Sequence, residues 1–288
     1  MTPTSYGESL GRLPKQMVEH VRALASGAVT PAEPRHAATV VLLRDSAAGI
    51  EAYLLRRQQT MAFAAGMHVF PGGSVDPRDA ALSPQAWVGP APSRWAPLLS
   101  ADEELATALV CAAVRETFEE SGVLLAGAVA GDVVADTTGD DWEADRQALV
   151  DRSLSLASLL DRRGLVLRAD LLRPWAHWIT PVVEPRRYDT RFFVAALPAG
   201  QRTRDVGGEA DRVTWARPED VLAAAERGDV GMLPPTAFTL AEIASYETVD
   251  DVLRAGDARD LQPVLPKIVV GDDDEARLLL PHHEGYDG

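Results

Sequence analysis

The sequence RETFEESGV, residues 115–123, carries the clearest structural signal in this chain of 288 residues. It closes a run of strong helix formers, residues 100–122, which ends at Gly122, a residue suited to a helix C-cap. Ser100 followed by Glu103 predicts a capping box at the start of the helix. Apolar residues fall on both sides of this helix, so we expect it to pack against a sheet in a layered α/β protein.

Three carboxylates lie together at the end of this predicted helix. Glu116, Glu119 and Glu120 are spaced i, i+3 and i+4, so they project from one face within about a turn. They repel one another and also oppose the negative end of the helix dipole, so something must compensate their charge. Oxygen ligands at this density suit Mg²⁺ or Mn²⁺, which bridge to substrate phosphates. A solvated acidic helix end is the alternative interpretation.

A tight turn precedes this helix in the sequence FPGGSVDPRDA, residues 70–80, where two glycines follow a proline. The turn resembles the opening of the Nudix hydrolase signature, and residues 115–123 resemble its core. The resemblance implies a Nudix-type α/β/α sandwich with a mixed β-sheet. It also implies that the turn lies against the carboxylate helix, and that a backbone carbonyl of Gly73 joins the metal ligands.

The resemblance further implies an activity. Glu116, Glu119 and Glu120 would be catalytic and metal-binding, with Gly73 as a further ligand and Mg²⁺ or Mn²⁺ as the ion. The implied reaction is metal-dependent hydrolysis of the diphosphate linkage in a nucleoside diphosphate derivative. A catalytically silent Nudix domain that acts as a ligand-binding sensor is the alternative, which the complete set around Arg115 disfavours. A structural protein with an acidic helix end is disfavoured by the glycine turn.

The connection between the turn and the helix is much longer than in the family pattern. The first glutamate of the signature therefore has no unique counterpart. Asp79 has the matching offset from Gly73, whereas Glu103 and Glu104 begin the helix. The family uses that residue structurally, so catalysis does not depend on the choice.

Residues 74–99 are assigned to an inserted loop. We expect it to be ordered, because Trp87 and Trp95 would pack on apolar surface. It directly follows the implied metal-binding turn, so we expect it at the rim of a substrate cleft, where it would select the group attached to the diphosphate. Residues 36–245 resemble a long-insertion branch of the family that includes a peroxisomal diphosphatase of coenzyme A and acyl-CoA.

The coenzyme A pattern of related enzymes is half matched, since Arg57 and Gly66 are present but Ala62 stands in place of an arginine. Arg57 and Arg187 are candidate substrate-binding residues, because a guanidinium can hold phosphate with two hydrogen bonds. Each could instead be a surface or ion-pair arginine. Glu209 is the candidate for a further catalytic carboxylate, because glycines precede it and a strand follows; a surface acid is the alternative.

The rest of the chain predicts further strands and helices around this centre. Residues 1–33 are assigned to an N-terminal helical extension and residues 34–288 to the Nudix hydrolase domain. Strands are expected at 38–45, 50–58, 67–70, 175–197 (two, joined by a turn) and 212–215, helices at 140–164, 218–228, 235–245 and 248–255, and a terminal hairpin at 263–281.

Composition and charge bound the function. With 46% hydrophobic and 25% charged residues, the chain is typical of soluble globular proteins. Its net charge of −15 disfavours nucleic-acid duplexes and anionic membranes as partners, and favours a small-molecule diphosphate bound by local cations. No signal peptide or membrane-spanning run is found, and the single cysteine fits a reducing compartment, so a cytoplasmic protein is expected. The sequence argues neither for nor against a homodimer.

Overall fold

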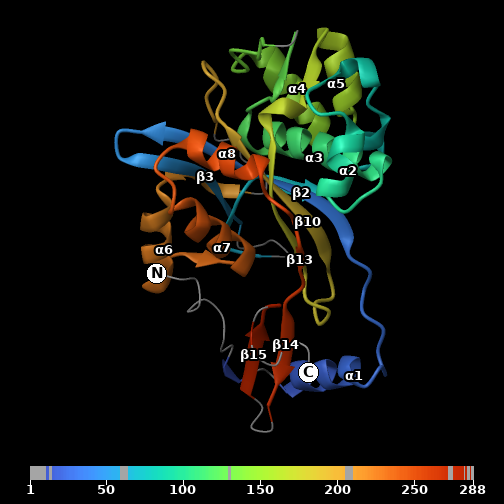
Figure 1. Ribbon diagram of the computed structural model, residues 1–288, viewed down its shortest axis with the longest axis vertical. Coiled ribbons are helices and arrows are strands. Elements are labelled where there is room, and N and C mark those ends of the chain that lie inside the picture. Colours follow the sequence, from blue (N-terminus) through green and yellow to red (C-terminus); the bar gives the residue numbers. More distant parts are fainter. Residues whose placement is uncertain are drawn as a thin grey trace. The chain divides into compact units, whose positions relative to one another are not determined.

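The computed structural model describes most of the chain (Figure 1). The described residues are 11–12, 15–58, 64–128, 131–204, 210–271, 275–281, 283 and 286. They form two compact units. The larger unit comprises residues 37–176 and 191–261, and the smaller one comprises residues 1–36, 177–190 and 262–288.

The main sheet is mixed, with strand order β12–β4–β3–β2–β10–β9–β13; β11 also pairs with β3, and β5 pairs with β2. Its strands are β2 (Arg35–Ser46), β3 (Gly49–Arg57), β4 (Met67–Val69), β5 (Gly72–Ser74), β9 (Arg173–Ile179), β10 (Tyr188–Ala196), β11 (Ala210–Ala216), β12 (Gly231–Met232) and β13 (Pro263–Val264). Neighbouring residues such as Leu42 and Leu43 are both fully buried. Since successive strand residues face opposite sides, both faces of the sheet are covered.

Helices cover this sheet in the larger unit. They are α2 (Pro92–Leu98), α3 (Glu103–Ser121), α4 (Asp140–Val150), α5 (Leu156–Arg163), α6 (Pro218–Glu226), α7 (Pro234–Ile243) and α8 (Val249–Asp257). In Figure 1, α2 to α5 lie on one side of the sheet and α6 and α7 lie on the other. The predicted α/β class with a mixed sheet is confirmed, as are the strands and helices named from the sequence. The stretch 140–164 forms two helices, since α4 and α5 are separated by a short connection.

Helix α3 is the central helix of the larger unit. Most of its residues are buried, as its two apolar sides predict. It ends at Gly122, whose φ of 74° is left-handed, so the predicted C-cap is confirmed. The predicted capping box is wrong, because the N-cap is Asp102, whose side chain accepts a hydrogen bond from the Leu105 N–H. Ser100 lies before the helix with a φ of 50°, where it cannot cap it.

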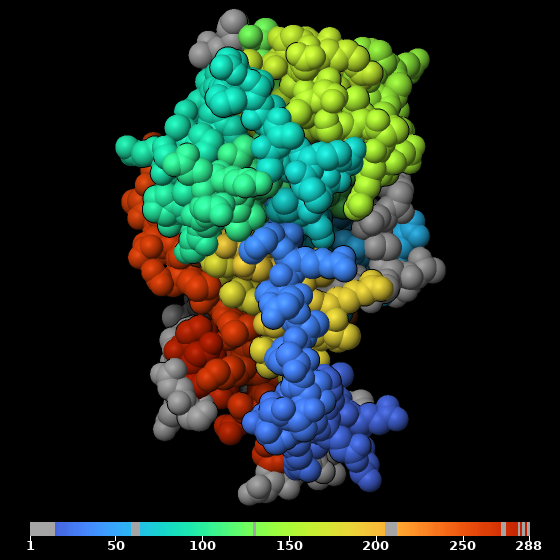
Figure 2. All heavy atoms as spheres, turned by 90° about the vertical axis from the view of Figure 1, so that its right-hand side faces the viewer, coloured from blue at the N-terminus to red at the C-terminus, as the bar shows by residue number. Residues whose placement is uncertain are grey.

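The insertion, residues 74–99, is ordered but is not a loop throughout. It contains the 3₁₀ turns η2 (Pro77–Ala81) and η3 (Pro84–Ala86), the short strand β6 (Trp87–Val88) and helix α2. Trp95 is buried and meets Phe193 edge to face, with ring centroids 5.8 Å apart, so its predicted packing is confirmed. These elements are too short to show a period in the sequence. Figure 2 shows the insertion, in teal, at the surface beside the yellow-green segment of α4 and α5.

A second, small sheet joins the insertion to the rest of the larger unit. Its order is β6–β8–β7, with β7 (Ala126–Gly127) and β8 (Val166–Arg168). The 3₁₀ turn η4 (Ala169–Leu171) follows β8. The insertion is therefore held at its centre by main-chain hydrogen bonds.

The smaller unit joins both ends of the chain. Helix α1 (Lys15–Ala25) packs on β14 (Lys267–Val270), and β1 (Gly11–Arg12) pairs with β15 (Glu275–Leu279). Strands β14 and β15 form the predicted antiparallel terminal hairpin, whose turn at 272–274 lies outside the described residues. The C-terminal strands thus group with the N-terminal helix through strand pairing and packing. The division into residues 1–33 and 34–288 stays a prediction.

No helix in the described part of the chain is both long enough and apolar enough to cross a lipid bilayer.

Candidate active site

The glycine turn lies directly against the carboxylate helix. Strand β5 pairs antiparallel with β2, with Gly73 opposite Ala38. A Cβ atom added to Gly73 would lie 2.5 Å from Oε1 of Glu116, and one added to Gly72 would lie 2.5 Å from Oγ1 of Thr39. Neither position has room for a side chain. The two glycines therefore allow the backbone of the turn to reach the Glu116 carboxylate.

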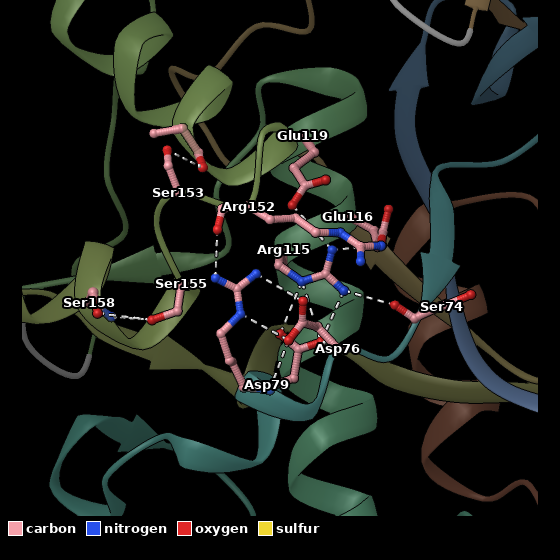
Figure 3. Close-up of polar contacts among 12 residues, drawn as sticks. Ser74, Asp76, Asp79, Arg115, Glu116, Glu119, Arg152, Ser153, Ser155 and Ser158 are labelled. Carbon is pink, nitrogen blue, oxygen red and sulfur yellow. Dashed lines mark hydrogen bonds and ion pairs between the residues drawn. The ribbon is translucent and has the colours of Figure 1, made fainter.

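Arg115 connects the parts of this site (Figure 3). Its Nη1 donates to Oε1 of Glu116 at 2.7 Å and to Oε1 of Glu119 at 3.1 Å. Its Nε and Nη2 donate to the Asp79 carboxylate at 3.0 and 2.9 Å, and Nη2 also donates to the Ser74 carbonyl at 2.9 Å. One guanidinium thus ties helix α3, the end of strand β5 and the insertion together.

The sequence offers Asp79, Glu103 and Glu104 as counterparts of the first glutamate of the signature, and their surroundings differ in the structure. Asp79 is buried, with 3% of its surface exposed, and it holds Arg115 from the first turn of the insertion. Its carboxylate also accepts a hydrogen bond from the Asp76 N–H at 2.8 Å. Glu103 and Glu104 are exposed at the start of α3. Of these three acids, Asp79 is the one that occupies the structural position beside Arg115.

Glu120 faces the turn. Its Oε2 accepts a hydrogen bond from the Gly72 N–H at 2.8 Å. The side chains of Glu116 and Glu119 are 12% and 13% exposed and accept from Arg115. In the described part of the chain, no three carboxylate, imidazole or thiol groups converge as a set of metal ligands. The oxygens of Glu116 and Glu119 thus face Arg115, whereas an oxygen of Glu120 faces the Gly72 N–H.

Burial dominates the electrostatics of this cluster. It raises the pKa of Glu116 to about 7, although Arg115 opposes the shift, and repulsion from Glu119 and Asp79 adds to it. Burial also raises the pKa of Glu119, against the lowering effect of Arg115. The single positive charge of Arg115 does not neutralise the negative charges of the carboxylates around it. A hard divalent cation fits both the oxygen donors and the uncompensated negative charge.

A second arginine covers the end of helix α3. Arg146 of α4 is buried, and its Nη1 donates to the Glu119 carbonyl at 2.7 Å. Its Nε and Nη2 donate to Glu143 at 2.9 and 2.6 Å. A cation at the negative end of the helix dipole offsets part of the repulsion there. Nothing in the local sequence pattern indicates that this arginine faces α3.

Arg57, Arg187 and Glu209 are the remaining candidate residues from the sequence. Arg57 is half-buried at the end of β3, opposite Ala210 of β11. Arg187, in the smaller unit, is buried and donates to the carbonyls of Ala32 at 2.7 Å and Thr180 at 3.0 Å. Glu209 and Ala62 lie outside the described residues. The roles of Arg57, Arg187 and Glu209 stay predictions.

Comparison with known proteins agrees with this arrangement. The family model of the NUDT19 Nudix domain matches residues 96–243, about half of the chain. The chain belongs to the Nudix hydrolase family. The crystal structure of the NUDIX hydrolase from Alicyclobacillus acidocaldarius superimposes with a TM-score of 0.67 at 29% identity, covering 77% of this chain and 96% of that one. The predicted Nudix fold is confirmed.

Two curated relatives of this Nudix hydrolase carry the name acyl-coenzyme A diphosphatase NUDT19. The protein of Homo sapiens is 28% identical over 283 residues, covering 83% of this chain and 73% of its own length. That of Gallus gallus is 25% identical over 253 residues, covering 74% of this chain and 66% of its own length. The chain thus spans about two thirds of the chicken protein.

Replacing Gly73 by alanine is expected to weaken the response to metal. The new Cβ would displace the Glu116 carboxylate, so the rise in melting temperature with millimolar Mn²⁺ should shrink. Gly164→Ala is the control, since an added Cβ there meets nothing and costs about 1–2 kcal/mol through its left-handed φ alone. A full Mn²⁺ response in Gly73→Ala would show that the turn does not position Glu116.

The response to metal is also expected to depend on pH. The folded state raises the pKa of Glu116 to about 7, so it binds this proton more tightly than the unfolded state does. Without metal, the carboxyl therefore loses its contribution to stability as the pH rises through about 7. A metal needs the ionised form, so the rise in melting temperature with Mg²⁺ should be larger at about pH 8 than at about pH 6. Glu116→Gln should remove this difference between the two pH values. Equal shifts at both pH values in the wild type would contradict the assignment of Glu116 as a metal ligand.

Proposed function

We propose that this chain is a diphosphatase that depends on a divalent metal and cleaves a diphosphate linkage in a nucleoside diphosphate derivative. The observation that supports this most strongly is the buried group of Glu116 and Glu119 around Arg115, pressed against Gly73. Such a site would cost stability unless a ligand used it. Coenzyme A and acyl-CoA are the proposed substrates, because relatives across most of the chain are named acyl-coenzyme A diphosphatases.

Glu116, Glu119 and Glu120, with the carbonyl of Gly73, are the proposed holders of Mg²⁺ or Mn²⁺. Bound there, the ion would neutralise charge on the diphosphate and lower the pKa of the attacking water. The protein's own part is to hold the carboxylates in place. Arg115 orients Glu116 and Glu119, and the Gly72 N–H orients Glu120.

Three further residues have proposed roles. Glu209 is proposed as a further catalytic carboxylate, and Arg57 as a substrate-binding residue. A substrate role for Arg187 would require it to release the carbonyls of Ala32 and Thr180. The cytoplasm is the proposed location, since the one cysteine, Cys111, is buried and free.

Glutamine substitutions test the function. Glu119→Gln and Glu120→Gln preserve shape but remove an anionic oxygen ligand, so kcat should fall by at least about 100-fold with the fold intact. Glu103→Gln, an exposed position on the same helix, makes the same chemical change and should leave kcat unchanged. The measurement is turnover of coenzyme A, acyl-CoA, nucleotide-sugar and dinucleotide substrates with Mg²⁺ and with Mn²⁺.

Two outcomes would contradict the proposal. Near-normal kcat in Glu119→Gln or Glu120→Gln would remove that residue from the metal ligands. No turnover of any diphosphate by the wild type, together with binding of one of them, would favour the silent sensor instead.

A further inference from the structure

The connection between helices α4 and α5, residues 151–155, carries an arginine in an unusual backbone conformation. Arg152 has a φ of 58°, in the left-handed region that favours glycine and asparagine. Its N–H donates to the Leu149 carbonyl at 2.9 Å. Its own carbonyl accepts a hydrogen bond from Nη1 of Arg78 at 2.9 Å. Hydrogen bonds at both its N–H and its carbonyl thus hold the backbone of this residue in place.

A series of hydrogen bonds through the insertion connects Arg152 to the carboxylate site. Arg78, which binds the Arg152 carbonyl, also donates from Nε and Nη2 to the Asp76 carboxylate at 3.0 and 2.9 Å. The Asp76 N–H donates to Asp79, and Asp79 holds Arg115. The first turn of the insertion therefore fixes the α4–α5 connection relative to the site.

The side chain of Arg152 extends back over this site. In the view of Figure 3 it passes over Arg115, and its end overlaps the region of Glu119 and Glu116. It lies near enough to Glu119 to lower the pKa of that carboxyl. Arg152 is exposed, whereas the side chain of Arg115 is 10% exposed and its nitrogens are occupied. In the described part of the chain, no hydrogen bond from the Arg152 guanidinium is present.

We propose that Arg152 is a phosphate-binding residue of this site. The proposal rests on the proposed function, because it needs a diphosphate to bind beside Glu116 and Glu119. An anionic substrate approaching a chain of net charge −15 needs a local cation that is accessible from solvent. A guanidinium can hold two phosphate oxygens at once, and Arg152 is placed at the carboxylates to do so.

A phosphate-binding role would also account for the strained backbone of Arg152. The left-handed φ of Arg152 is unfavourable for a residue with a Cβ atom, and the hydrogen bond from Arg78 to its carbonyl holds it there. Strain of this kind persists where the surroundings over-determine it, and it is concentrated at functional sites. A counter-ion for the glutamates alone is the competing role, and the experiment separates the two.

The test is Arg152→Asn, since asparagine tolerates the left-handed backbone and keeps the fold. Binding of ADP in the presence of Mg²⁺, measured by calorimetry, should weaken by about tenfold, the loss expected for a charged hydrogen-bonding partner. The KM for the best substrate should rise similarly, and Arg152→Lys should recover part of it. The Mn²⁺-induced rise in melting temperature should be kept or enlarged, because a positive charge beside the ligands is gone. Arg227→Asn, at an exposed arginine paired with Asp229, is the control.

Unchanged ADP affinity in Arg152→Asn, or no ADP binding by the wild type, would overturn the proposal. Loss of the Mn²⁺ response together with lower stability would also overturn it and assign Arg152 a structural role. Failure of the proposed function would give a different result from failure of the Arg152 assignment. A wild type that binds ADP through Arg152 but hydrolyses no diphosphate would keep this residue assignment and remove the enzymatic activity.

Discussion

The guanidinium of Arg115 lies among the carboxylates of Asp79, Glu116 and Glu119 and bonds to the carbonyl of Ser74. Buried ion groups of this kind are poor sources of net stability, because desolvation consumes most of their attraction. Removing one partner is nonetheless expensive, about 3–5 kcal/mol, because it leaves a charge buried alone. The group therefore fixes geometry: the turn, the helix and the start of the insertion can meet in only one way.

The position of Asp79 explains how the connection between the glycine turn and helix α3 can contain a long insertion. Asp79 comes before most of the added residues, so the acid partner of Arg115 keeps its short distance in sequence from the glycine turn. The additional chain then leaves the site and returns through α2, with Trp95 buried against the core. Only the first residues of the insertion, Ser74 and Asp79, bond to Arg115, so the residues after Asp79 can differ without removing a partner of Arg115. The insertion also contributes Arg78, which reaches the connection between α4 and α5.

The sequence predicts the parts of this site whose signals are local. The glycine turn, the glutamates at helical spacing and Gly122 each follow from the conformation that one short segment must adopt. The start of α3 could not be predicted correctly, because Ser100 and Asp102 are both good caps and the preceding backbone decides between them. The choice of Asp79 over Glu103, the small elements of the insertion and the position of Arg152 depend on contacts between distant segments. No local pattern encodes such contacts.

We propose that Arg115 and the Gly72 N–H together hold Glu116, Glu119 and Glu120 in position for a divalent cation. Anomalous diffraction from crystals grown with Mn²⁺ tests this proposal most directly, because it locates the ion without reference to activity. We expect an anomalous peak in contact with oxygens of these glutamates, beside Gly73. A well-ordered crystal with Mn²⁺ bound elsewhere, and with these carboxylates still turned to Arg115 and Gly72, would contradict it.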